Sequence, residues 1–236
     1  MHVFPGRFSC NVREVAVNCP EVGNLPAYGG PADAGAGHCR GRLRVFGTSW
    51  STAMEIRQTA KAIIDEVSCV LSLTDTAQAL AFTDALLAVP RVFVFGEGRS
   101  GLVARAFAMR LMQMEVEAYV VGETTTPAME KGDLLVAVSG SGQTPSTILF
   151  AENAKKAGGR VAAVVADAHT KLGEVADILL VIPGKAKTGV GVNSIQMPGS
   201  LFEQAAFVFF DAVIAVLAQK RGRSYQDMFK KHANLE

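Results

Sequence analysis

The segment Asp133–Thr144, DLLVAVSGSGQT, constrains the fold more than any other part of the chain. Its consecutive apolar residues, Leu134–Val138, are typical of a strand buried on both faces, as in a parallel sheet. Glycines and hydroxyl residues follow directly, and an apolar run from Ile148 predicts that a helix begins there. The segment therefore predicts a strand, loop and helix of an α/β fold, with the loop at the carboxyl edge of a sheet.

The same order of strand, loop and helix recurs after Pro90. Continuous apolar runs predict strands at 92–95, 118–121, 134–138, 161–165 and 178–182, and helices at 102–114, 148–157 and 201–218. Upstream, 54–72 has the period of an amphipathic helix, and Asp75 with Gln78 resembles a capping box at the start of a second helix. We therefore expect a three-layer αβα sandwich with a five-stranded parallel, flavodoxin-like sheet, preceded by two helices.

Size, charge and cysteine content narrow the class of protein. The 236 residues are 49% hydrophobic, which is ample for a core, and 23 basic against 22 acidic residues argue against a nucleic-acid or membrane-surface binder. The apolar stretch 201–218 contains three polar residues and predicts a buried or subunit-contacting helix rather than a membrane span. The four cysteines form no disulfide framework, and the first residues do not resemble a secretory signal, so we expect a cytoplasmic protein.

The first 51 residues differ in character from the rest. Glycine and proline are scattered through 1–51 without a sustained period, which predicts a disordered or poorly packed extension before a folded domain at 52–236. Its cysteines and histidines match no zinc-ligand spacing, so we predict no metal site. A natural start at Met54 is an alternative explanation of this segment.

Two loops carry the candidate binding residues, and both are expected at the same sheet edge. Residues 96–101, GEGRSG, match the dinucleotide pattern G-x-G-x-x-G, with Glu123 in the place of the ribose-binding acid. A second loop at 139–144 adds further hydroxyls there, and this favours a small phosphate ester over NAD. The alternative is that both loops only turn the chain and cap helices. The predicted binding residues are Gly98, Arg99, Ser100, Thr124, Ser139, Gly140, Ser141 and Thr144, with backbone N–H groups of Gly140 and Gly142 assisting.

Several segments together resemble the sugar isomerase (SIS) family, and within it the 6-phospho-3-hexuloisomerases. They are GEGRSG at 96–101, VGETTTP at 121–127, SGSGQT at 139–144, SIQMPGSLFEQA at 194–205 and HANLE at 232–236. The resemblance implies an SIS domain over 52–236 that interconverts 3-hexulose 6-phosphate and fructose 6-phosphate through a cis-enediol, in the ribulose monophosphate route of formaldehyde fixation. It implies no metal and no redox cofactor. It also implies a homotetramer and a possible pathway partner, 3-hexulose-6-phosphate synthase.

The chemistry requires a proton acceptor, and Glu203 is the candidate. By pattern alone, Ser200 and Glu203 form a capping box at the start of the last long helix. The resemblance implies instead that Glu203 is the catalytic base, and that His232, in a terminus reaching a neighbouring subunit, handles charge on the sugar oxygens. His169 has a weaker claim. The alternatives are another SIS phosphosugar isomerase, a non-catalytic phosphosugar-binding regulator, or a dinucleotide-dependent oxidoreductase.

Overall fold

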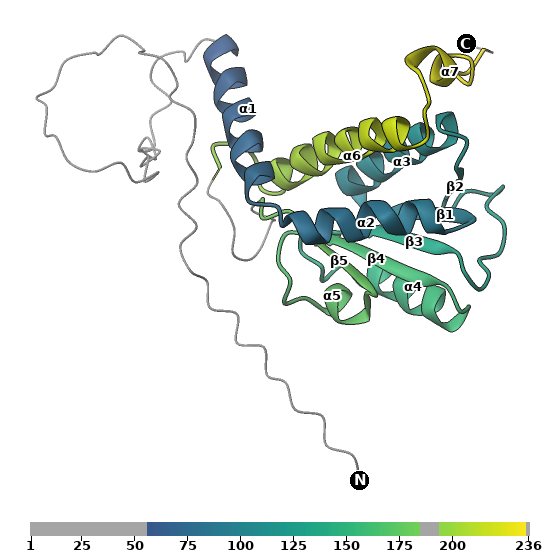
Figure 1. Ribbon diagram of the computed structural model, residues 1–236. Helices are drawn as coiled ribbons and strands as arrows, with labels where there is room; N and C mark the ends of the chain where they lie inside the picture. The colour runs from purple at the N-terminus through teal and green to yellow at the C-terminus, as the bar shows by residue number, and fades with distance from the viewer. Residues whose placement is uncertain (1–55, 185–193, 235–236) are drawn as a thin grey trace, which may run out of the picture. The chain divides into compact units, whose positions relative to one another are not determined.

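The computed structural model describes residues 56–184 and 194–234 (Figure 1). The elements are α1 (Ile56–Ser72), α2 (Thr76–Ala88), β1 (Arg91–Gly96), α3 (Gly98–Gln113), β2 (Glu117–Val120), β3 (Leu134–Val138), α4 (Pro145–Lys156), β4 (Arg160–Val165), α5 (Lys171–Val175), β5 (Ile178–Val181), α6 (Ser200–Lys220) and α7 (Tyr225–Phe229). The predicted extension, residues 1–51, lies outside the described residues, and so stays a prediction.

The five strands form one parallel sheet in the order β2-β1-β3-β4-β5. Alternate residues of β1 face opposite layers, because side chains along a strand alternate in direction. Val92 and Val94 lie in the apolar cluster shared with α1, α2, α3 and α6, whereas Phe93 lies in the cluster shared with α4 and α5 (Figure 1). The three-layer fold expected from the sequence is confirmed, including the two preceding helices.

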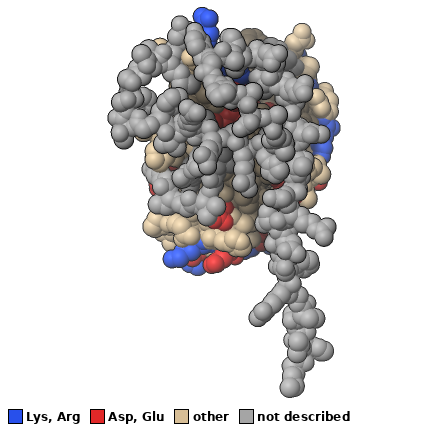
Figure 2. All heavy atoms as spheres, turned by 90° about the vertical axis from the view of Figure 1, so that its left-hand side faces the viewer, with Lys and Arg blue, Asp and Glu red and all other residues tan. Residues whose placement is uncertain are grey.

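Helix α6 packs against the other three helices of the larger layer, α1, α2 and α3. The Phe210 ring stacks on Phe107 of α3 with 4.2 Å between ring centroids, so α3 and α6 pack side by side (Figure 1). By length and composition α6 could cross a membrane, but 56% of its apolar window is buried inside the domain. That share is typical of a core helix. Where Figure 2 leaves the described residues uncovered, both basic and acidic side chains appear among uncharged surface, in keeping with the balanced composition.

The structure corrects several predicted helix boundaries. Helices α3 and α4 begin at Gly98 and Pro145, three or four residues before the apolar runs that predicted them, because the first residues of each carry no large apolar side chain. The short helices α5 and α7 were not expected, since five residues are too few to show a period. The capping box predicted for α2 is half right. Asp75 accepts a hydrogen bond from the Gln78 backbone N–H (2.8 Å), but the Gln78 side chain accepts from Val181 N–H of edge strand β5 (2.8 Å).

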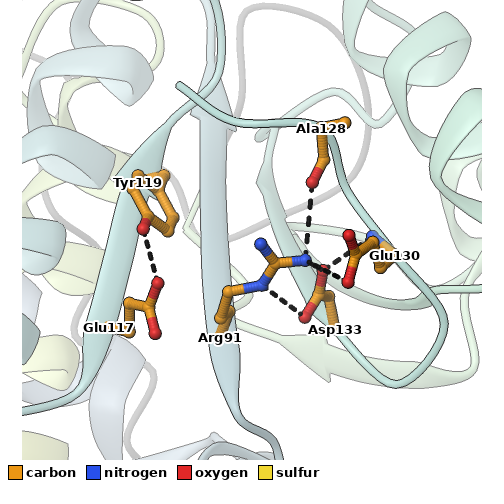
Figure 3. Close-up of polar contacts among 6 residues, drawn as sticks. All are labelled: Arg91, Glu117, Tyr119, Ala128, Glu130 and Asp133. Carbon is orange, nitrogen blue, oxygen red and sulfur yellow. Dashed lines mark hydrogen bonds and ion pairs between the residues drawn. The ribbon is translucent and has the colours of Figure 1, made fainter. Parts of the chain in front are cut away.

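A polar cluster at the amino ends of β1 and β3 fixes the connection that crosses between β2 and β3 (Figure 3). Arg91 binds Asp133 through two hydrogen bonds of 3.0 and 2.6 Å, and Asp133 also accepts from the Glu130 backbone N–H at 2.7 Å. The hydrogen bond to Asp133 raises the pKa of Arg91. In the same view Tyr119 donates to Glu117, which raises the pKa of Tyr119. This cluster lies at the edge opposite the glycine-rich loops, so we assign it a structural role.

Candidate active site

The amino-terminal ends of α3, α4 and α6 meet at the carboxyl edge of β1 and β3 (Figure 1). Ser146, in the first turn of α4, donates to Glu97 before α3 (2.7 Å), and Arg99 of α3 donates to Glu203 of α6 (2.5 Å). The sheet order reverses direction between β1 and β3, and this is where such sheets bind ligands. Three helix amino termini at one point favour an anionic ligand.

Glycines of the first loop allow the backbone to pack closely. A Cβ on Gly101 would lie 2.4 Å from the Gly96 carbonyl oxygen, and one on Gly96 would lie 2.9 Å from both the Ser100 carbonyl carbon and the Val138 oxygen. The first turn of α3 therefore rests directly on the ends of β1 and β3, and Ser100 is buried there. No hydrogen bond of the Ser100 hydroxyl is found within the described part of the chain, so this hydroxyl can bond to a ligand.

The second loop is shaped by its own hydroxyls. The Ser139 and Thr144 hydroxyls lie 3.1 Å apart and bond to each other, and the Ser141 hydroxyl accepts a long bond from Gln143 N–H (3.3 Å). Gly142 has φ +58° and donates its N–H to the Ser139 carbonyl (2.9 Å), so this amide is already used within the loop. Ser141 is thus the better placed hydroxyl for a ligand, while Ser139, Thr144 and Gly142 hold the loop.

Glu203 is a buried carboxylate in the first turn of α6. The capping-box interpretation is wrong, because the N-cap residue is Gly199 (φ +91°) and no side chain caps the helix. The carboxylate instead pairs with Arg99, whose side chain is 61% exposed against 10% for Glu203. The ring of Phe202 lies against Gly140, where a Cβ would come within 2.8 Å of it. Glu203, Arg99 and the two loops therefore form one site.

Known proteins resemble this chain in sequence and in fold. Residues 85–208 match the family model of the SIS domain. The chain belongs to the SIS domain family.

Close similarity extends to named enzymes of this family. The SIS protein is 40% identical to a Bacillus subtilis 3-hexulose-6-phosphate isomerase, over 78% of this chain and 100% of that protein. It is 41% identical to the 3-hexulose-6-phosphate isomerase of Mycobacterium gastri, over 77% of this chain and 92% of that protein. A crystal structure from Methanococcus jannaschii, described as inferring a 3-hexulose-6-phosphate isomerase function, superposes with a TM-score of 0.66 at 32% identity, over 75% and 98% of the two chains.

Two predicted residues are not brought to the centre of this SIS site. Thr124 is exposed in the turn after β2, the edge strand, where neighbouring Glu123 pairs with Arg105 (2.5 Å). His232 is exposed and follows α7, which lies past the carboxyl end of α6, whereas Glu203 is in the first turn of α6 (Figure 1). Helix α6 has 21 residues, which corresponds to about 30 Å, so His232 does not reach Glu203 of the same chain. His169 is exposed, and its backbone N–H donates a hydrogen bond to the Asp167 carboxylate (2.9 Å).

One buried acid of the SIS domain was missed as a site residue. Glu66 lies within the amphipathic helix predicted at 54–72 and was not among the predicted site residues, yet it is only 7% exposed. The signal was present in the sequence, because Glu66 follows Ile63 by three residues and precedes Val70 by four, on the apolar face. Within the described residues, no group of three or more His, Cys, Asp or Glu side chains is placed to hold a metal ion.

Proposed function

We propose that this SIS-domain protein is a 3-hexulose-6-phosphate isomerase, which interconverts D-arabino-3-hexulose 6-phosphate and D-fructose 6-phosphate. The observation that carries the proposal is the buried Glu203 carboxylate, paired with Arg99 where three helices begin. The identity to named isomerases, 40% over the whole length of one of them, supports the substrate. The reaction predicted from the sequence motifs is thus the reaction in the names of these relatives.

Moving the carbonyl from C3 to C2 requires one proton acceptor that serves both carbons. Glu203 as a carboxylate takes the proton from C2, which leaves a 2,3-enediolate, and returns it to C3. The C3 oxygen gains a proton and the C2 hydroxyl loses one, so the reaction has no net oxidation. The Arg99 guanidinium stabilises the negative charge on these oxygens, because it lies beside the acid and is exposed to an incoming sugar.

The phosphate is held where the helix amino termini meet. Their dipoles favour an anion, and the hydroxyls of Ser100 and Ser141 supply hydrogen-bond donors on two sides. Ser139, Thr144, Gly98 and Gly140 shape these loops, and Thr124 lies at the outer margin of the same sheet edge. Binding the phosphate here leaves the sugar carbons to reach Glu203.

Assembly and location form a further part of the proposal. Exposed apolar side chains on α6 and α3, among them Phe207, Val208, Val216, Leu102 and Met109, provide a surface for other copies of the chain. We propose a cytoplasmic homotetramer in which His232 acts at the site of a neighbouring subunit. The enzyme would act in the ribulose monophosphate pathway, with 3-hexulose-6-phosphate synthase as a possible pathway partner.

A coupled assay tests the reaction. Enzymatically made 3-hexulose 6-phosphate is supplied, and fructose 6-phosphate is followed through auxiliary glucose-6-phosphate isomerase and dehydrogenase, with and without chelator. We expect turnover in both conditions, and much slower turnover of pentulose and heptulose phosphates. Absence of fructose 6-phosphate, with phosphosugar binding intact, would instead support a non-catalytic regulator.

A further inference from the structure

The Glu66 carboxylate holds the segment that leads into α6. Its Oε2 accepts hydrogen bonds from the Ser194 hydroxyl (2.7 Å) and from the Gln196 side-chain amide (3.1 Å), and its Oε1 accepts from Ile195 N–H (2.9 Å). None of the ion pairs recorded for the described residues includes Glu66. Three neutral donors from one short segment therefore compensate a buried charge.

Packing alone does not explain an acid at this position. Glu66 lies on the helix face of Ile63, Val67 and Val70, and an apolar residue there would pack against α6 without the cost of removing a carboxylate from water. A buried carboxylate is strongly stabilised only when its donors are fixed in place. The three hydrogen bonds to Glu66 thus hold Ser194–Gln196 in one position. An apolar side chain at residue 66 would make none of these bonds and would not fix the segment.

Backbone hydrogen bonds connect this segment to the first turn of α6, and so to Glu203. Ser200 N–H bonds to the Met197 carbonyl (3.0 Å), and Glu203 N–H bonds to the Gly199 carbonyl (3.1 Å). The first turn of α6 has no side-chain cap of its own, so the preceding segment sets where the helix begins. Among the residues that the structure describes, Glu66 is the side chain from outside this segment that hydrogen-bonds to it.

We propose that Glu66 is a positioning residue for proton transfer: through Ser194–Gln196 it sets the first turn of α6, and hence the place of the Glu203 carboxylate relative to Arg99 and the bound sugar. This inference rests on the proposed function of Glu203. A base displaced by about 1 Å loses up to ~10²-fold in rate while the phosphate contacts persist.

The test measures rate, binding and local amide exchange in matched variants. Glu66→Ala should lower kcat roughly 10- to 100-fold, with KM changed less than about threefold. Glu66→Gln keeps one of the two oxygen acceptors, so it can accept from Ile195 N–H or from the Ser194 and Gln196 side chains but not from all three, and its loss should be smaller. Asp65→Asn removes an exposed acid from the same helix, and Val70→Ala weakens the packing of α1 without touching the three hydrogen bonds. Both controls should keep the kcat of the unaltered enzyme.

Hydrogen exchange separates this inference from the proposed function. Amides of 195–203 should exchange faster in Glu66→Ala than in Val70→Ala, even at matched loss of thermal stability. A Glu66→Ala enzyme with normal kcat, or with unchanged exchange over 195–203, overturns the positioning role. If the unaltered protein fails to isomerise 3-hexulose 6-phosphate, the proposed function fails, and the exchange result still decides whether Glu66 positions α6.

Discussion

The two ends of the α3 and α6 pair each carry an arginine paired with a glutamate, and the two pairs differ in the exposure of the glutamate and in the number of its cation partners. At the amino-terminal end, Arg99 of α3 pairs with Glu203 of α6. At the other end, Glu115 follows α3 and pairs with Arg223 and with Lys231 (3.0 Å), both beyond α6. The Glu203 side chain is 10% exposed and that of Glu115 is 38% exposed.

This difference shows which features make an acidic residue a candidate catalytic residue. Two cations hold Glu115 and lower its pKa, chiefly through the hydrogen bond from Lys231, and water has ready access to the group. Among the described residues, Glu203 pairs with one cation, Arg99, whose side chain is exposed, and its neighbour Phe202 packs against Gly140 of the second loop. An ion pair alone does not indicate a site, whereas burial at the carboxyl edge of the sheet beside unused donors does.

The sharpest test of the comparison replaces each acid by its amide. Glu203→Gln keeps the shape but cannot accept a proton from C2, so kcat should fall about 10³-fold or more, while phosphosugar affinity stays within a few fold. Glu115→Gln should retain kcat within about twofold, because its pair lies at the opposite end. Steady-state kinetics with 3-hexulose 6-phosphate, and calorimetric titration with fructose 6-phosphate, measure both quantities. Substantial turnover by Glu203→Gln would remove the base assignment.

Sequence patterns predicted the sheet well and the partners of its side chains poorly. Leu134–Val138 was predicted to the residue, because a strand buried on both faces is apolar throughout. The Glu203 partner was missed, since Arg99 lies 104 residues away and local spacing indicated a cap instead. The predicted partner of the Gln78 side chain was wrong for the same reason, because this side chain bonds to β5 rather than to its own helix. Local patterns report periodicity and caps, but contacts between distant segments depend on the assembled fold.

The second test concerns the two arginines. Arg99→Ala removes the cation beside Glu203, and we expect kcat/KM to fall roughly 10- to 100-fold because charge on the sugar oxygens is no longer stabilised. The Arg99 side chain is 61% exposed, so the fold should survive. Arg99→Lys should recover only part of the activity, since an ammonium lacks the planar fork of donors. Arg223→Ala is the matched control. It removes a surface ion pair away from the site, so kcat/KM should stay within about twofold of the value for the unaltered protein. Equal effects from Arg99→Ala and Arg223→Ala would mean that the two ends are not functionally distinct.

The smallest expected effect is the pH dependence of the outer pair. The pKa of Glu115 is lowered in the folded protein, so its contribution to stability is present above the unfolded value, about 4.3, and is lost as pH falls through the folded pKa. The difference in melting temperature between the unaltered protein and Glu115→Gln should therefore be largest near neutral pH. It should vanish in acid and shrink at high salt, because exposed charges are screened. Thermal unfolding of both proteins across this pH range measures the difference. Asp65→Asn, which removes the exposed Lys61–Asp65 pair, serves as a reference. If this difference in melting temperature persisted unchanged below about pH 3, it would have to come from packing rather than from the charge of Glu115. The two ends of the α3 and α6 pair would then differ less than their ion pairs suggest.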